Sequence, residues 1–141
     1  MRLGFALCVV TALLMGAKAP KELETLQGNW QLSSGEMNGK PLPEKELKGK
    51  ITIKGAEYTL TIGDGEKVTG TQKLNTTANP KTIDIQNANG PDKGKTHLGI
   101  YEVKDDTFRV VFSAVGKPRP TKFETHPDSG EWMHVWKLVK E

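Results

Sequence analysis

Cysteine is nearly absent from this chain, whose 141 residues include a single one, Cys8. It lies in an apolar N-terminal run that we expect to be removed from the mature protein. A mature chain without cysteine excludes disulfide bonds, thiol nucleophiles and thiolate ligands for a metal.

Long apolar runs are equally scarce, and the clearest one occupies residues 3–15. Arg2 precedes it, and the Ala-Lys-Ala tripeptide at 17–19 places small residues at the positions that a signal peptidase reads. The run is too short to span a bilayer comfortably. We therefore predict a signal peptide at 1–19, one domain at 20–141, export to the periplasm or the extracellular space, and no membrane span in the mature chain.

A concentrated charge of one sign is also missing. The predicted signal peptide contains two of the 20 basic residues and none of the 17 acidic ones, so the mature chain has a net charge of +1. Lysines and acids alternate along that chain, whereas nucleic-acid-binding proteins usually carry a concentrated basic face. We therefore expect no nucleic-acid partner.

Motifs that carry chemistry are missing as well. The chain has no G-x-S-x-G nucleophile motif, and His97, His126 and His134 do not have the spacing of metal ligands. The glycine-rich segment 90–96 resembles a phosphate-binding loop, but it has one residue too few between its glycines, and a strand pattern follows it. We assign no catalytic residue, no metal site and no cofactor, and the sequence does not support an enzyme.

The chain is instead rich in short Thr-, Val- and Ile-containing runs, which Gly, Asn, Asp and Pro separate. These runs predict strands at 29–36, 50–54, 57–62, 66–74, 81–86, 95–103, 107–113 and 131–139. A short helix is predicted in front of the first strand, and a helical turn near 43–47. Consecutive hairpins favour an antiparallel meander, and closure into a barrel removes its two exposed edges. The predicted fold is all-β, an eight-stranded antiparallel up-and-down barrel with a short N-terminal helix.

Side-chain parity fixes the predicted hairpin registers. Around the turns, Ile53 pairs with Tyr58, Tyr58 with Gly70, and Phe112 with Gly99, so that large rings face glycines. The side chains predicted to line the barrel interior are Trp30, Ile51, Ile53, Tyr58, Leu60, Val68, Tyr101, Val103, Phe108, Val110 and Phe112.

Two functions of different classes are compatible with such a barrel. In the first, a monomeric binding module holds a small apolar or amphiphilic ligand in the interior. The predicted ligand-binding residues are Tyr58, Tyr101, Phe108, Phe112, Trp132, His134 and Trp136. In the second, the interior is filled by side chains, and the domain docks onto a protein of the cell envelope.

The predicted docking element is the long loop 114–130. Lys117, Arg119 and Phe123 are its candidate contact residues, and two prolines keep it extended. The loop could equally be a strap that Phe123 packs across one end of the barrel. We expect any cavity to be small, to open beside this loop, and to lie opposite Trp30.

Four stretches of the chain carry a resemblance to a known family: L-Q-G-N-W at 26–30, N-G-K-P-L-P at 38–43, L-G-I-Y-E at 98–102 and G-K-P-R-P-T at 116–121. With them the chain resembles, nearly end to end after the leader, a family of small exported domains abundant in planctomycete bacteria. The resemblance implies a lipocalin-like barrel and export. That family has no assigned activity, so no catalytic residue is implied.

A wider similarity to lipocalins and other calycins rests on Gly28 and Trp30. In lipocalins this tryptophan packs across the closed end of the barrel under a basic side chain from near the end of the chain. The resemblance implies that Lys137 occupies the place of that basic side chain.

Overall fold

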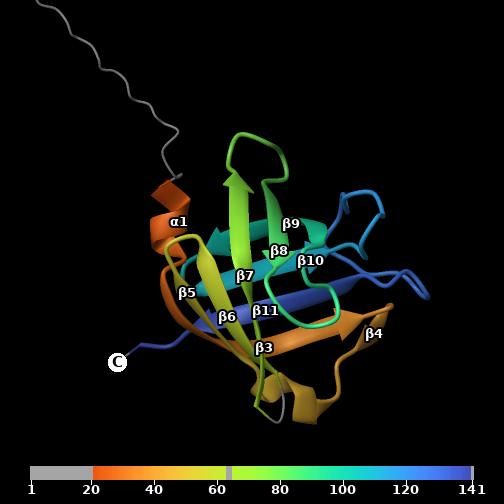
Figure 1. Cartoon of the computed structure of the whole chain (residues 1–141), viewed down its shortest axis with the longest axis horizontal. Helices are drawn as coiled ribbons and strands as arrows, with labels where there is room; N and C mark the ends of the chain where they lie inside the picture. The colour runs from red at the N-terminus through yellow and green to blue at the C-terminus, as the bar shows by residue number, and fades with distance from the viewer. Residues whose placement is uncertain (1–20, 63–64, 141) are drawn as a thin grey trace, which may run out of the picture.

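Nine strands and very little helix make up the part of the chain that the structure describes, residues 21–62 and 65–140 of a computed structural model (Figure 1). The predicted signal peptide lies outside these residues. The elements, in chain order, are α1 (Lys21–Thr25), β3 (Gly28–Met37), β4 (Lys40–Pro41), the 3-10 helix η2 (Glu44–Lys48), β5 (Lys50–Lys54), β6 (Glu57–Ile62), β7 (Glu66–Asn75), β8 (Thr82–Asn87), β9 (Thr96–Lys104), β10 (Thr107–Phe112) and β11 (Trp132–Leu138).

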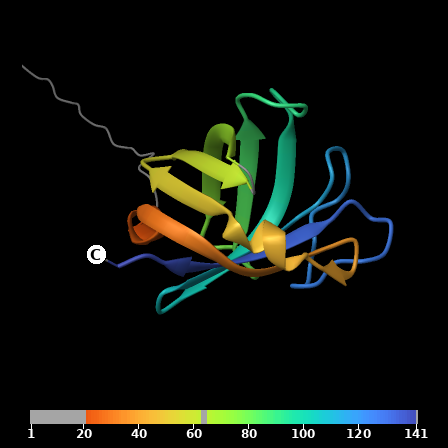
Figure 2. The same ribbon diagram turned by 90° about the horizontal axis from the view of Figure 1, so that it is seen from below.

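The strands form one antiparallel sheet that closes on itself. Neighbours follow the order β3, β5, β6, β7, β8, β9, β10 and β11, and β11 also pairs with β3. The closed barrel thus has eight strands, as the sequence predicts. The additional strand, β4, was not predicted; it pairs with the end of β3 through a tight hairpin. In Figures 1 and 2, α1 lies at one end of the barrel, and β4 and the loop between β10 and β11 lie at the other.

The predicted registers are confirmed. Ile53 pairs with Tyr58, Tyr58 with Gly70, and Phe112 with Gly99. A methyl group on Gly70 would lie 2.5 Å from the Tyr58 side chain, and one on Gly99 would lie 2.6 Å from the Phe112 ring. Only glycine leaves the space that these two rings occupy inside the barrel.

The predicted interior is confirmed as well. Seven of its members belong to the buried core: Trp30, Ile53, Tyr58, Tyr101, Phe108, Val110 and Phe112. Partly buried Ile51, Leu60 and Val103 pack against this core, and half-buried Val68 also faces inward. Alternation along each strand therefore sorts apolar side chains to the inside, as the pleat of a half-buried strand requires.

The end of the barrel beside α1 is closed. Trp30 is 1% exposed and Leu26 is 0% exposed, and the Trp30 indole Nε1 donates a hydrogen bond to the Leu26 carbonyl oxygen at 2.9 Å. Gly28, with a φ of 119°, makes the turn from the helix into β3 in a conformation that other residues rarely adopt. The G-x-W signature thus combines a backbone turn with an aromatic plug.

An ion-pair network fastens α1 to the barrel wall. The Tyr101 hydroxyl donates to Glu22 Oε1, and the Lys81 ammonium donates to Glu22 Oε2, each at 2.6 Å. Burial acts to raise the pKa of Glu22, but the hydrogen bonds and the charge of Lys81 outweigh it and hold that pKa below its usual value. At neutral pH Glu22 is therefore ionised, and its carboxylate accepts from both donors.

Candidate ligand-binding site in the barrel

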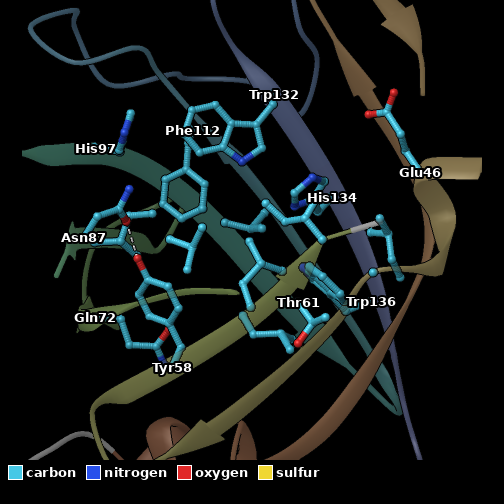
Figure 3. A pocket seen from close by; sticks show the side chains of 18 of the residues that line it. Glu46, Tyr58, Thr61, Gln72, Asn87, His97, Phe112, Trp132, His134 and Trp136 are labelled. Atoms are coloured by element: carbon cyan, nitrogen blue, oxygen red, sulfur yellow. Dashed lines mark hydrogen bonds between the residues drawn. The ribbon is translucent and has the colours of Figure 1, made fainter. Parts of the chain in front are cut away.

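A cavity of about 310 Å³ occupies the half of the barrel away from α1 (Figure 3). The barrel is therefore not filled by its side chains. Aliphatic groups from several strands line it, among them Leu32, Ile51, Leu60, Val68, Ile85 and Val110. An eight-stranded barrel can hold one small ligand in such a space.

Six of the seven predicted ligand-binding residues line this cavity: Tyr58, Phe108, Phe112, Trp132, His134 and Trp136. Tyr101 does not, because its side chain lies at the closed end, where it bonds Glu22. The prediction that Tyr101 lines the ligand cavity is thus wrong. Ligand binding by the other six residues stays a prediction.

Aromatic rings form the wall beside β10 and β11. The rings of Phe112 and Trp132 lie 5.3 Å apart at an interplanar angle of 35°. The His97 ring meets Trp132 edge-on at 4.8 Å, and the His134 ring meets Trp136 edge-on at 5.3 Å. Edge-to-face contacts of this kind fix the orientation of each ring, so the wall has a defined shape.

His134 brings a polar ring into this apolar wall. It alternates with Trp132 and Trp136 on β11, so all three side chains point into the barrel. Burial lowers the pKa of His134 to about 4, and the imidazole is therefore neutral at physiological pH. Among the described residues, no group forms a hydrogen bond with the ring. One N–H donor and one nitrogen lone pair are free to meet a bound molecule.

The opposite wall carries a second unpartnered polar group, the Gln72 side chain. Gln72 is 7% exposed, and its Nε2 atom has no hydrogen-bond partner in the described part of the chain. Its neighbours are satisfied, since the Tyr58 hydroxyl donates to Asn87 Oδ1. Burial raises the pKa of Tyr58 to about 12, so this hydroxyl keeps its proton. Figure 3 shows the Tyr58–Asn87 pair and Gln72 across the cavity from His134.

His97 also lines the cavity, but its nitrogens are occupied. Nδ1 lies 2.9 Å from the Ser113 carbonyl oxygen, and Nε2 lies 3.1 Å from Asp92 Oδ2. Both nitrogens of this buried ring therefore lie within hydrogen-bond distance of protein oxygens. His97 is thus a structural group that ties the β8–β9 loop to the end of β10.

The mouth of the cavity is framed by exposed residues at the ends of β3 and β6 and in η2. Met37 is 46% exposed and Ile62 is 39% exposed, and Glu46 of η2 also lines the opening. The expectation that loop 114–130 bounds the cavity is wrong, because no residue of that loop, which is described throughout, lines it.

The loop lies instead on the outer wall of the barrel. Arg119 donates to Asp84 Oδ1 at 2.7 Å and to the Gly99 carbonyl oxygen at 2.9 Å. The Arg109 guanidinium lies 4.1 Å from the centre of the Phe123 ring. Asp84 and Arg109 face outward, because their strand neighbours point into the barrel. The part of the loop from Arg119 to Phe123 is therefore a strap along the side of the barrel, while Thr125 and Gly130 hydrogen-bond to the end of β3 and the β3–β4 turn.

This strap explains two buried residues on the outside of the sheet. Ile100 and Val111 pair with each other across β9 and β10, facing away from the interior. They are nevertheless only 1% and 0% exposed. Part of the loop thus serves to cover an apolar patch of the outer wall. Lys117, another candidate contact residue, is exposed.

Lys137 does not cover Trp30. It is exposed, and its ammonium donates to the Thr107 hydroxyl at 2.9 Å. Trp136 and Leu138 point inward from β11, so the residue between them must point outward. The Phe108 ring, 5.8 Å away and edge-on, packs against Trp30 instead. The expected position of Lys137 is thus wrong for this chain.

Sequence reasoning missed Gln72. Gly70 and Leu74 point into the barrel from β7, and the same parity places Gln72 beside them. The polar run from Thr69 to Lys73 conceals this pattern, because inward and outward positions are both hydrophilic there.

In residues 21–62 and 65–140, no helix is long and apolar enough to cross a membrane. The same residues bring no three histidine or acidic side chains together as a metal site. Comparison of the chain with protein-family models, with curated proteins and with solved structures found no match.

Proposed function

We propose that this protein is an exported binding module that holds one small apolar molecule in its barrel. The cavity of about 310 Å³ carries the proposal, since an unfilled, largely apolar space inside a closed barrel is the usual form of a ligand site. Export rests on the signal peptide predicted at 1–19 and on the resemblance to exported domains.

The size of the cavity favours a compact ligand. At the packing density of a protein interior, a space of this volume accommodates roughly 10 to 20 non-hydrogen atoms. A nucleotide exceeds that size. The ligand is therefore expected to be one or two fused rings, or a short branched chain.

The mouth supports entry from one side. Met37 and Ile62 form an exposed apolar rim, while Trp30 and α1 close the other end. An apolar ligand that enters beside these two residues contacts apolar side chains from the mouth inward. Entry between η2 and the end of β6 requires no opening of the barrel.

Native mass spectrometry of protein purified from its own host tests for a retained ligand. A titration with N-phenyl-1-naphthylamine, an uncharged fluorescent probe, tests for binding by the purified protein. Val68→Phe, which fills the cavity, is expected to lower the affinity for the probe at least about tenfold. Val115→Phe is the matched control, because the same substitution is made at an exposed position of the loop.

We expect saturable one-to-one binding of the probe, which Val68→Phe weakens and Val115→Phe leaves unchanged. No retained ligand and no saturable probe binding would overturn the proposal. Docking of an envelope protein through loop 114–130 would then be the remaining function.

A further inference from the structure

The polar groups in the cavity fall into two sets. Tyr58 bonds Asn87, and both nitrogens of His97 have acceptors within the protein. Gln72 Nε2 is buried without a partner in the described part of the chain, and the half-buried His134 ring, which also lines the cavity, forms no hydrogen bond there. An unpartnered buried polar group destabilises a protein, and such groups are rare in native structures. These two groups therefore have the character of a site that a ligand completes.

The lining offers no compensation for a buried charge. Within the described part of the chain, no lysine or arginine lines the cavity. Of the two carboxylates that do, Asp92 already contacts His97, and Glu46 is exposed at the mouth. The low pKa of His134 keeps its ring uncharged. A charged group drawn into this space would lose its hydration without gaining a counter-ion.

We infer that the cavity selects an uncharged, ring-sized molecule with one hydroxyl or N–H group, which hydrogen-bonds to the His134 imidazole. This inference rests on the proposed function and adds the chemical class of the ligand. The aromatic wall of Phe112, Trp132 and Trp136 contacts the ring. The imidazole, in its neutral form, can donate to or accept from the polar group of the ligand.

The two unpartnered polar groups lie on opposite sides of the cavity, so each could form one hydrogen bond with an apolar ligand placed between them. Figure 3 shows His134 and Gln72 on opposite sides of the cavity, with apolar side chains between them. A molecule that reaches His134 therefore lies with its apolar part toward Gln72. A second polar group on the ligand is needed only where it can reach the Gln72 amide.

Four probes with one ring system separate these requirements in isothermal titration calorimetry at neutral pH. Naphthalene tests the apolar cavity alone, and 2-naphthol adds one hydroxyl. 2-Naphthoate adds a negative charge, and 2-naphthylmethylammonium adds a positive one. We expect 2-naphthol to bind about tenfold more tightly than naphthalene, and both charged probes to bind at least about tenfold more weakly than 2-naphthol.

His134→Phe tests the assigned partner, since it keeps an aromatic ring beside Trp136 and removes both nitrogens. It should abolish the preference for 2-naphthol over naphthalene while naphthalene binding persists. His126→Phe is the matched control, because His126 is exposed in the loop and outside the cavity. Circular dichroism melting of both variants verifies that they fold.

The outcomes distinguish this inference from the function on which it rests. The inference would be overturned if naphthalene and 2-naphthol bound with equal affinity, if a charged probe bound most tightly of the four, or if His134→Phe kept the preference for 2-naphthol. Each of these results would leave cavity binding intact. Failure of all four probes to bind the wild-type protein would count against the proposed function itself.

Discussion

The two halves of this barrel treat their polar groups differently. At the closed end, Trp30 Nε1 bonds the Leu26 carbonyl, and Glu22 receives hydrogen bonds from both Tyr101 and Lys81. In the open half, by contrast, Gln72 Nε2 is buried without a partner among residues 21–62 and 65–140, and the half-buried His134 ring lines the cavity without a hydrogen bond to any of them.

Within this small domain, the closed end contributes mainly to stability, and the open half contributes mainly to the proposed binding function. A packed end with satisfied polar groups gains burial and hydrogen bonding together. A cavity with unsatisfied groups gives up both, and a natural sequence retains such a feature mainly where it has a use. Substitutions at the closed end should therefore mainly lower stability, and those in the open half should mainly change binding.

Trp30→Ala should have the largest effect on stability. It removes a fully buried ring from between Leu26 and Phe108, together with the indole hydrogen bond. The expected loss in the free energy of unfolding is about 3–5 kcal/mol. Denaturant unfolding measures it, and Trp132→Ala, at a partly exposed tryptophan of the cavity wall, should lose less than half as much. An equal loss in the two variants would abolish the contrast between the halves.

Acidification should destabilise the open half through His134. The pKa of its side chain is about 4 in the folded state, against 6.5 as its ordinary value. Between these pH values the unfolded chain takes up a proton that the folded chain does not. The free energy of unfolding should therefore decrease as the pH falls from 6.5 to 4, by up to about 3 kcal/mol. Above pH 6.5 the contribution vanishes, because both states are neutral.

His134→Phe is the test of this pH dependence. The difference in unfolding free energy between this variant and the wild type, measured from pH 7 to pH 4, isolates His134. Contributions from Glu22 and Glu131, whose pKa values are lowered, and from His126, whose pKa is raised, are common to both proteins and cancel. A pH-independent difference would contradict the neutral, buried state of His134.

Tyr101→Phe should have a smaller effect, about 2 kcal/mol, because it removes one hydrogen bond to a carboxylate. Tyr58→Phe is the same substitution in the open half, where the acceptor is the neutral Asn87 amide oxygen. It should lose about 1 kcal/mol. Chemical denaturation of both variants gives the comparison, and a larger loss at Tyr58 would reverse the expected ranking.

The barrel was predictable because local signals agreed with one another. Tyr58 and Phe112 face Gly70 and Gly99 only in the correct register, and a slip of one residue would turn every apolar side chain outward. The alternation of residues along β11 also predicted which of its side chains point inward, and His134 is one of them. The same parity places Lys137 outside, so the structural reason against its inferred role was present in the sequence.

The course of the strap and the size of the cavity were not predictable in this way. Arg119 meets Asp84 across 35 residues of sequence, and no periodicity links an irregular loop to the wall that it covers. Whether the rings fill the barrel depends on how Phe112 and Trp132 pack in three dimensions. The unpartnered state of Gln72 likewise depends on distances between strands, which parity does not supply.

Gln72→Met gives the smallest expected effect and the only one of opposite sign. Methionine has nearly the shape of glutamine and fills the same space, but it has no amide group to leave unsatisfied. Since Nε2 has no partner in the described part of the chain, its removal should stabilise the ligand-free protein by about 0.5–1 kcal/mol. A thermal melt of the two proteins, both stripped of ligand, measures the change. If Gln72 holds a ligand, the same variant should bind a probe that reaches the amide more weakly while melting higher. Destabilisation by Gln72→Met would instead mean that the amide contributes to folding, and the division between a stable closed half and a binding open half would then fail at this residue.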